Sequence, residues 1–149
     1  MKTIRNLILV LGDQLDLESS LIKGVDPSSD LIWMAEVEEE SVHVWSHKQK
    51  IVLFLSAMRH FRDALLKQGL PLIYTELEEG TESFAVSLKN TLKEYKPETV
   101  LVLRPGSWRV LKAIQSVCKK YSVEFKVSED DNFFTTPDEF KAFAENRKA

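Results

Sequence analysis

The chain has 149 residues, of which 44% are hydrophobic, and this size and composition suit one compact domain with its own core. The formal net charge of -3 predicts no broad electropositive face, so we expect no direct contact with nucleic acid. The single cysteine, Cys118, excludes an internal disulfide. No apolar run approaches the roughly 20 residues that a membrane helix requires. We therefore expect a cytoplasmic protein with no membrane contact.

Five short apolar runs predict the strands of one sheet. They cover residues 6–11, 31–37, 70–77, 100–103 and 123–127. The first four are nearly continuous in aliphatic residues, which is typical of strands that are covered on both faces. The fifth alternates apolar with charged residues, and this pattern favours an edge strand.

Helical periods fill the gaps between these runs. Apolar residues at spacings of three and four predict helices over 41–68, 81–95 and 107–121, with Thr81 as the cap of the second. Thr136 followed by Pro137 predicts the start of a final helix, and the connection over 16–30 is expected to contain a short helix that ends near Gly24. The alternation predicts an α/β fold: a doubly wound, five-stranded, mostly parallel sheet, Rossmann-like or flavodoxin-like, in a single domain over 1–149.

The first strand-to-helix loop contains Gly12, Asp13 and Gln14. Ligands of open parallel sheets bind at the carboxyl ends of the strands, so this loop is a candidate site. It has one glycine instead of the three of a dinucleotide fingerprint, which disfavours a phosphate ligand. Asp13 and Gln14 could bind the hydroxyls or ring amide of a neutral ligand, or they could simply form a turn and a helix cap.

The second loop is acidic. Glu36 ends an apolar strand and is expected to point into the crevice, where a carboxylate needs a donor. Glu40, His43 and His47 share one helical face at a spacing that can bind metal, but Val44 stands where the zinc-protease pattern requires Glu. A polar pocket lining or plain surface is therefore favoured, while acid/base catalysis in a free-standing hydrolase, or a nucleotide-binding module, is the alternative function.

The fourth loop adds two arginines and a tryptophan. Arg104 and Arg109 could clamp an anion, although Arg109 could equally pair with nearby carboxylates. Trp108 could stack on a planar ring, or pin the following helix to the sheet, which is the favoured interpretation. Cys118 falls on a core-facing helical position and is interpreted as a small buried hydrophobe.

Several strings together resemble a known family. They are residues 9–15 (LVLGDQL), Glu36 with Val37, the basic segment 47–51, residues 56–61 (SAMRHF), and Pro105-Gly106 with Trp108-Arg109. This set is similar to the deoxyribodipyrimidine photolyase-related proteins, the bacterial iron-sulfur cryptochromes and (6-4) photolyases. The resemblance covers essentially the whole chain.

The resemblance implies an amino-terminal antenna domain with no catalytic site and no metal ligands of its own. Its partner would be a C-terminal helical domain that holds FAD and an iron-sulfur cluster, for which one cysteine is too few. The intact parent would be a photolyase-type lyase for light-driven DNA repair, or a blue-light sensor. The implied antenna pigment is 6,7-dimethyl-8-ribityllumazine, and the implied binding residues are Gly12, Asp13, Gln14, Glu36, Glu40 and His43, with Gly106 and Trp108 as second-rank candidates.

Overall fold

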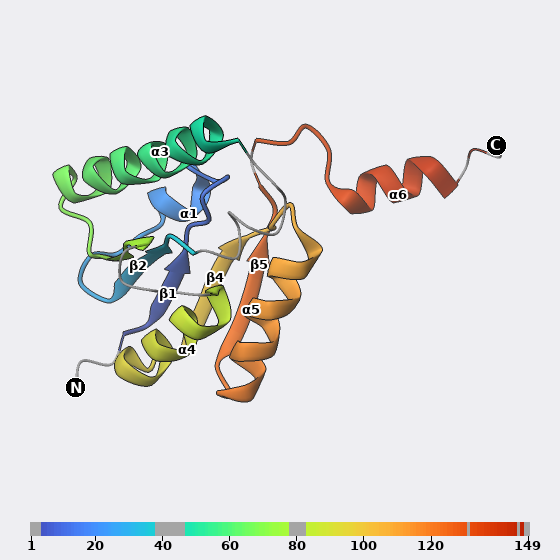
Figure 1. The fold of residues 1–149 in the computed structure, drawn as a ribbon. Helices are drawn as coiled ribbons and strands as arrows, with labels where there is room; N and C mark the ends of the chain where they lie inside the picture. The colour runs from blue at the N-terminus through green and yellow to red at the C-terminus, as the bar shows by residue number, and fades with distance from the viewer. Residues whose placement is uncertain (1–3, 38–46, 78–82, 131, 146, 148–149) are drawn as a thin grey trace.

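The computed structural model describes residues 4–37, 47–77, 83–130, 132–145 and 147. They form a five-stranded sheet in the order β3-β2-β1-β4-β5, in which every neighbouring pair is parallel (Figure 1). The strands are β1 (Asn6–Leu9), β2 (Asp30–Ala35), β3 (Leu72–Thr75), β4 (Thr99–Leu103) and β5 (Glu124–Ser128). The predicted doubly wound α/β fold is confirmed, and the strand order reverses between β1 and β4.

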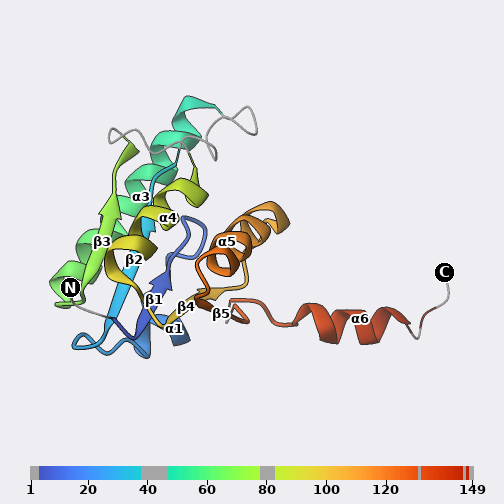
Figure 2. The same ribbon diagram turned by 90° about the horizontal axis from the view of Figure 1, so that it is seen from below.

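Helices cover both faces of the sheet, as Figures 1 and 2 show. One face carries α1 (Ser20–Lys23) and α3 (Lys48–Lys67), and the other carries α4 (Phe84–Tyr95) and α5 (Trp108–Lys120). Side chains alternate along a strand, so Leu7 and Leu9 of β1 pack in the α4–α5 core while Ile8 and Val10 pack in the α1–α3 core. Two buried layers therefore hold the strand ends in place.

Two of the expected helices begin later than their sequence patterns indicate. His47 has extended backbone and caps α3, its Nδ1 accepting from the Gln49 N–H at 3.3 Å, so one continuous helix over 41–68 is wrong. Ser83 likewise caps α4, whose start was expected at Thr81. Residues 41–46 and Thr81 lie outside the described residues. His47 interrupts an apolar period that continues through it in the sequence, whereas Ser83 directly precedes Phe84, the first apolar residue of the second period.

The last helix, α6 (Pro137–Glu145), extends away from the sheet (Figures 1 and 2). Thr136 and Glu139 form a reciprocal capping box, which confirms the predicted helix start. Phe140 and Phe143 on α6 are 64% and 54% exposed. Across the described part of the chain, no helix has both the length and the apolarity needed to cross a membrane.

Candidate functional site

A cavity of about 120 Å³ opens at the carboxyl ends of the central strands. Its walls come from the segments after β1 and β2, from α3 and α4, and from the loop before α5. Its lining residues are Leu11, Gly12, Asp13, Ala35, Glu36, Val37, Phe54, Leu55, Met58, Phe84, Pro105, Ser107 and Val110. The cavity thus lies where the strand order reverses, which is where the fold predicts a ligand site.

Gly12 is required at this wall because an aromatic ring occupies the space of its missing side chain. A Cβ at Gly12 would lie 2.3 Å from Cζ of Phe54 and 2.9 Å from Sδ of Met58. Both of these side chains come from α3. The glycine therefore lets α3 approach the first loop closely enough to close one side of the cavity.

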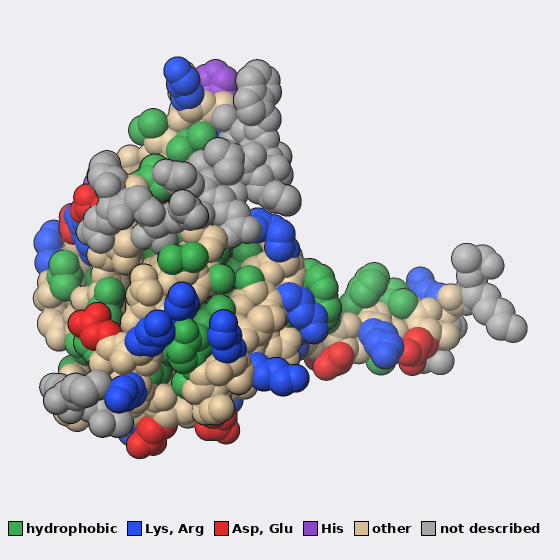
Figure 3. Space-filling model, turned by 60° about the horizontal axis from the view of Figure 1, so that its bottom comes forward, with side chains coloured by type: hydrophobic (Ala, Val, Ile, Leu, Met, Phe, Trp, Pro, Cys, Tyr) green, Lys and Arg blue, Asp and Glu red, His purple; other side chains and the backbone are tan. Residues whose placement is uncertain are grey.

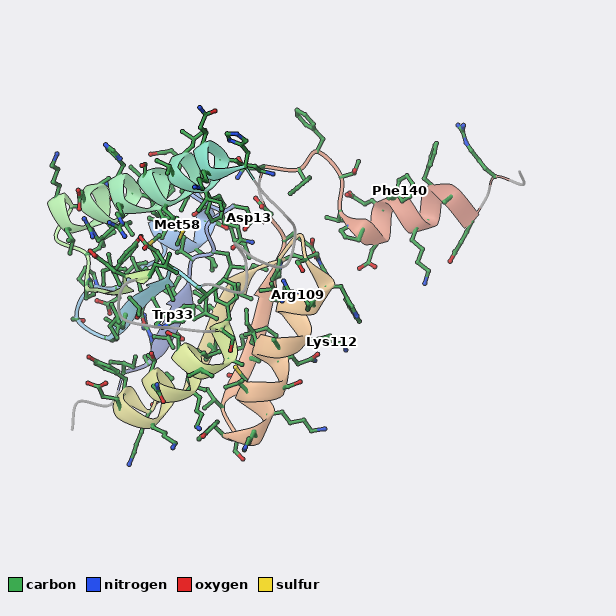
Figure 4. The ribbon with its side chains drawn as sticks, viewed as in Figure 1. Asp13, Trp33, Met58, Arg109, Lys112 and Phe140 are labelled. Carbon is green, nitrogen blue, oxygen red and sulfur yellow. The ribbon has the colours of Figure 1, made fainter. Side chains whose placement is uncertain are left out.

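Asp13 is the exposed carboxylate of the cavity wall. It accepts no hydrogen bond from the described residues, and its Oδ2 lies 3.6 Å from the position of a Cβ on Gly106. Figure 4 shows Asp13 and Met58 at the same end of the sheet, with Trp33 deeper in the core. Asp13 can therefore accept a hydrogen bond from a ligand N–H or hydroxyl.

Glu36 has the opposite environment, because its carboxylate is fully buried and fully bonded. Arg59 donates to it from Nε at 2.7 Å and from a terminal nitrogen at 2.8 Å. The Tyr74 hydroxyl and the Leu77 N–H complete the set at 2.5 and 2.9 Å. Burial raises the pKa of Glu36, but these four hydrogen bonds outweigh it, so the pKa lies below its ordinary value.

This network fixes Glu36 as a structural anion. It joins the end of β2 to α3, β3 and the segment after β3, and it leaves no free lone pair directed at a ligand. Burial and the bond to the carboxylate also raise the pKa of Tyr74, so its hydroxyl stays protonated as a donor. Glu36 therefore contributes to the cavity wall chiefly by holding it in shape.

Gln14 turns into the protein. Its side chain is buried, and Nε2 donates to the carbonyls of Leu103 at 3.1 Å and Arg104 at 3.3 Å. These bonds tie the loop after β1 to the end of β4 across the switch point. Oε1 of Gln14 is buried with no partner among the described residues.

The loop before α5 differs from expectation in two ways. The guanidinium of Arg104 is held by the carboxylate of Glu129, with Nε 3.0 Å from both oxygens, so it does not clamp an anion here. Trp108 is 67% exposed and stacks under Lys112, whose Nζ lies 4.5 Å from the ring centroid. The interpretation that Trp108 pins the helix to the sheet is therefore wrong, because its ring projects from the first turn of α5 instead of packing beneath it.

The predicted site residues thus fall into separate groups. Gly12, Asp13 and Glu36 line the cavity, whereas Gln14 lies behind its wall. Gly106 lines a second cavity of about 360 Å³, which is bounded by Arg104, Glu129, Phe133 and the start of α6. Glu40 and His43 lie outside the described residues, and no cluster of potential metal ligands occurs among those that are described.

The sequence analysis missed the apolar half of the site. Phe54, Met58 and Phe84 line the cavity, although their spacing marked them only as parts of helices. Arg59 was also missed as the partner of Glu36. A carboxylate at the end of a buried strand does require a donor, but the sequence does not indicate which arginine supplies it.

Comparisons with known proteins find two similarities in sequence. The sequence profile of the family described as deoxyribodipyrimidine photo-lyase-related protein matches residues 8–149. A (6-4) photolyase of Agrobacterium fabrum (strain C58 / ATCC 33970) is 32% identical over 145 residues. That match covers 96% of this chain but 29% of the relative, so the chain spans less than a third of the relative's length.

Proposed function

Because the chain belongs to the deoxyribodipyrimidine photo-lyase-related protein family, we propose that its strand-end cavity holds an antenna pigment for a light-driven flavoprotein. The pigment would absorb light and transfer the excitation to FAD in a C-terminal helical domain of the parent. Repair of DNA by the parent, as in the (6-4) photolyase relative, or blue-light sensing, would follow from that step. FAD and an iron-sulfur cluster would be held by the helical domain.

The observation that supports a pigment most is the pairing of an apolar wall with one free carboxylate. Phe54, Met58 and Phe84 offer the surfaces on which a planar ring system packs. Asp13 offers an acceptor with no partner among the described residues. The loop after β1 lacks the glycine-rich cradle that a phosphate requires, so the phosphate-free 6,7-dimethyl-8-ribityllumazine is compatible with this apolar wall and its single acceptor.

The size of the cavity supports the proposal that a partner domain completes the site. Pockets that enclose a drug-sized ligand usually measure about 300–1,000 Å³. At about 120 Å³, this cavity can enclose only part of the pigment. We expect the helical domain to supply the remaining wall, so the chain alone should bind the pigment weakly.

The alternative function, acid/base catalysis by the strand-end carboxylates, is less well supported. A general acid or base must exchange a proton with its substrate. The carboxylate of Glu36 is held by four donors, and its pKa lies below the ordinary value, so it stays ionised and occupied. Among the described residues of the cavity, Asp13 alone provides no acid/base pair, and Glu40 and His43, which this alternative also uses, lie outside them.

A titration of the chain with 6,7-dimethyl-8-ribityllumazine tests the proposal, because the pigment's own fluorescence anisotropy rises on binding. Asp13→Asn keeps the shape of the side chain and removes its charge, and a hydrogen bond to a charged group contributes about 1.5–3 kcal/mol. Binding should therefore weaken by at least about tenfold. Asp63→Asn, on the exposed side of α3, is the matched control and should bind like the unmodified chain. Equal binding by the two variants, or no anisotropy change at millimolar chain, would contradict the proposal.

A further inference from the structure

The outward surface of α4 and α5 carries a concentration of positive charge, which we call the basic face. Figure 3 shows Lys and Arg side chains gathered over this side of the molecule. The cations are Lys89 and Lys93 on α4, and Arg109, Lys112, Lys119 and Lys120 on α5. The α5 sequence contains no acidic residue, and α4 contains only Glu94. A net charge of -3 for the whole chain therefore conceals a strongly cationic surface.

Four lysines of the basic face are not explained by internal pairing. Lys89, Lys93, Lys119 and Lys120 are exposed and form no ion pair with the described residues. Lys89 and Lys93 are one helical turn apart, and like charges at this spacing destabilise a helix. Lys93, Lys119 and Lys120 lie in last turns, where the helix dipole favours a cation. What points to an anionic partner is therefore the exposed pair of Lys89 and Lys93, together with the scarcity of acidic residues on the two helices.

An exposed aromatic ring lies at the end of this row of cations. Trp108 begins α5 and is 67% exposed, with Lys112 over one side of its ring. Figure 4 shows Arg109 and Lys112 on the same helix, along the edge of the molecule away from α3. Proteins that bind single-stranded nucleic acid combine the same two features, a cationic track for phosphates and an aromatic ring on which a base stacks.

We propose that the basic face binds single-stranded nucleic acid, with its lysines on the phosphates and Trp108 stacked on a base. From Arg109 to Lys120 the α5 helix extends about 16 Å, which is long enough for several phosphates. Unpaired bases are required because those of a duplex are stacked on one another and closed to a flat ring. This inference departs from the expectation drawn from net charge, and it is independent of the proposed pigment.

Fluorescence anisotropy of a labelled single-stranded 12-mer, titrated with the chain at 50 mM NaCl, tests the inference. The variant Lys89→Glu/Lys93→Glu/Lys112→Glu should bind at least 30-fold more weakly. Each released counterion contributes about 0.7 to the slope of log affinity against log salt, so that slope should become shallower by about 2. The matched control, Lys48→Glu/Lys50→Glu/Lys67→Glu, makes the same charge change at exposed positions of α3 and should weaken binding less than threefold.

Variants of Trp108 distinguish base stacking from simple charge attraction. Loss of one base–aromatic stack should weaken binding of the single strand by about tenfold in Trp108→Ala, while Trp108→Phe should stay within about threefold of the unmodified chain. Binding of a duplex of the same sequence should not change in either variant. Equal losses in the two triple variants, no effect of Trp108→Ala, or tighter binding to vesicles of anionic lipid than to the 12-mer would overturn the inference. Circular dichroism and melting curves of every variant check that the fold is kept.

Discussion

Replacing Arg59 with Met should lower the free energy of unfolding by more than the same replacement of Arg62, the other arginine of α3. The substitution keeps an unbranched apolar stem and removes the guanidinium that donates twice to Glu36. Glu36 would then keep only the Tyr74 hydroxyl and the Leu77 N–H as donors. A buried carboxylate that loses its cation is strongly destabilising.

The size of the effect follows from the burial of the two partners. Removing one member of a buried ion pair costs about 3–5 kcal/mol. The Arg59 side chain is 34% exposed and two donors to Glu36 persist, so we expect the lower end, about 3 kcal/mol. At this chain length that corresponds to a fall in melting temperature of roughly 6–12 °C.

The prediction also states in which direction the loss of stability should change with pH. In the unmodified chain the pKa of Glu36 is lowered, so its ion pair stabilises the fold above the unfolded pKa of about 4.3 and is lost as pH falls through the folded pKa. Without Arg59, burial dominates and the folded pKa rises above 4.3. The penalty is then largest at neutral pH and is relieved as pH falls through that raised pKa. The stability difference between the two proteins should therefore shrink between pH 7.5 and pH 4.5.

Urea unfolding at pH 7.5 and at pH 4.5 measures this difference. Arg62→Met is the matched control, because Arg62 lies on the same helix and pairs with two half-exposed carboxylates. Pairs of that kind contribute about 0–1 kcal/mol. A loss of less than 1 kcal/mol in Arg59→Met at pH 7.5, or a difference that grows toward pH 4.5, would refute the role assigned to the Glu36 network.

Three further predictions concern the cavity wall and the core. Gly12→Ala should destabilise the chain by about 1–3 kcal/mol in urea unfolding, because its Cβ overlaps the Phe54 ring, and Phe54→Ala should remove most of that penalty in the double variant. Gln14→Leu should cost about 1–2 kcal/mol and speed hydrogen exchange near the end of β4, since two carbonyls lose their donor. Cys118 should react with a disulfide reagent at pH 8 at least about 100-fold more slowly when folded than in urea, because burial raises its pKa to about 11; equal rates would contradict its place in the core.

The fold could be predicted from local sequence because four strands are short, nearly continuous apolar runs, the fifth alternates as an edge strand does, and the helices have a clear period. The errors lie at helix starts, where His47 and Ser83 adopt extended backbone within the ranges expected to be helical. A capping side chain competes with the next helical turn, and the outcome depends on tertiary contacts that spacing does not encode. Strand order is also non-local, although the alternation of elements limited it to a few doubly wound arrangements.

The candidate site was predicted less well, for a physical reason that Asp13 and Glu36 illustrate. Both are acidic residues that follow a central strand, and in the sequence they are equivalent candidates. The structure gives four donors to Glu36 and none from the described residues to Asp13. Donors such as Arg59 and Tyr74 lie 23 and 38 positions away along the chain, so only the fold distinguishes a bonded carboxylate from an available one.

The different environments of Glu36 and Asp13 also account for how the cavity keeps its shape next to the loop after β1. The Glu36 network holds the end of β2, α3 and the end of β3 together, and Gln14 fixes the loop after β1 to the end of β4. The walls formed by the loop after β1, the end of β2 and α3 are thereby anchored by buried polar contacts, and a buried group that loses its partner is costly. Asp13 projects from this rigid frame, so its carboxylate is held in position without being used by it. A ligand that bonds to Asp13 would meet a site whose shape is already set, and this lowers the ordering cost of binding.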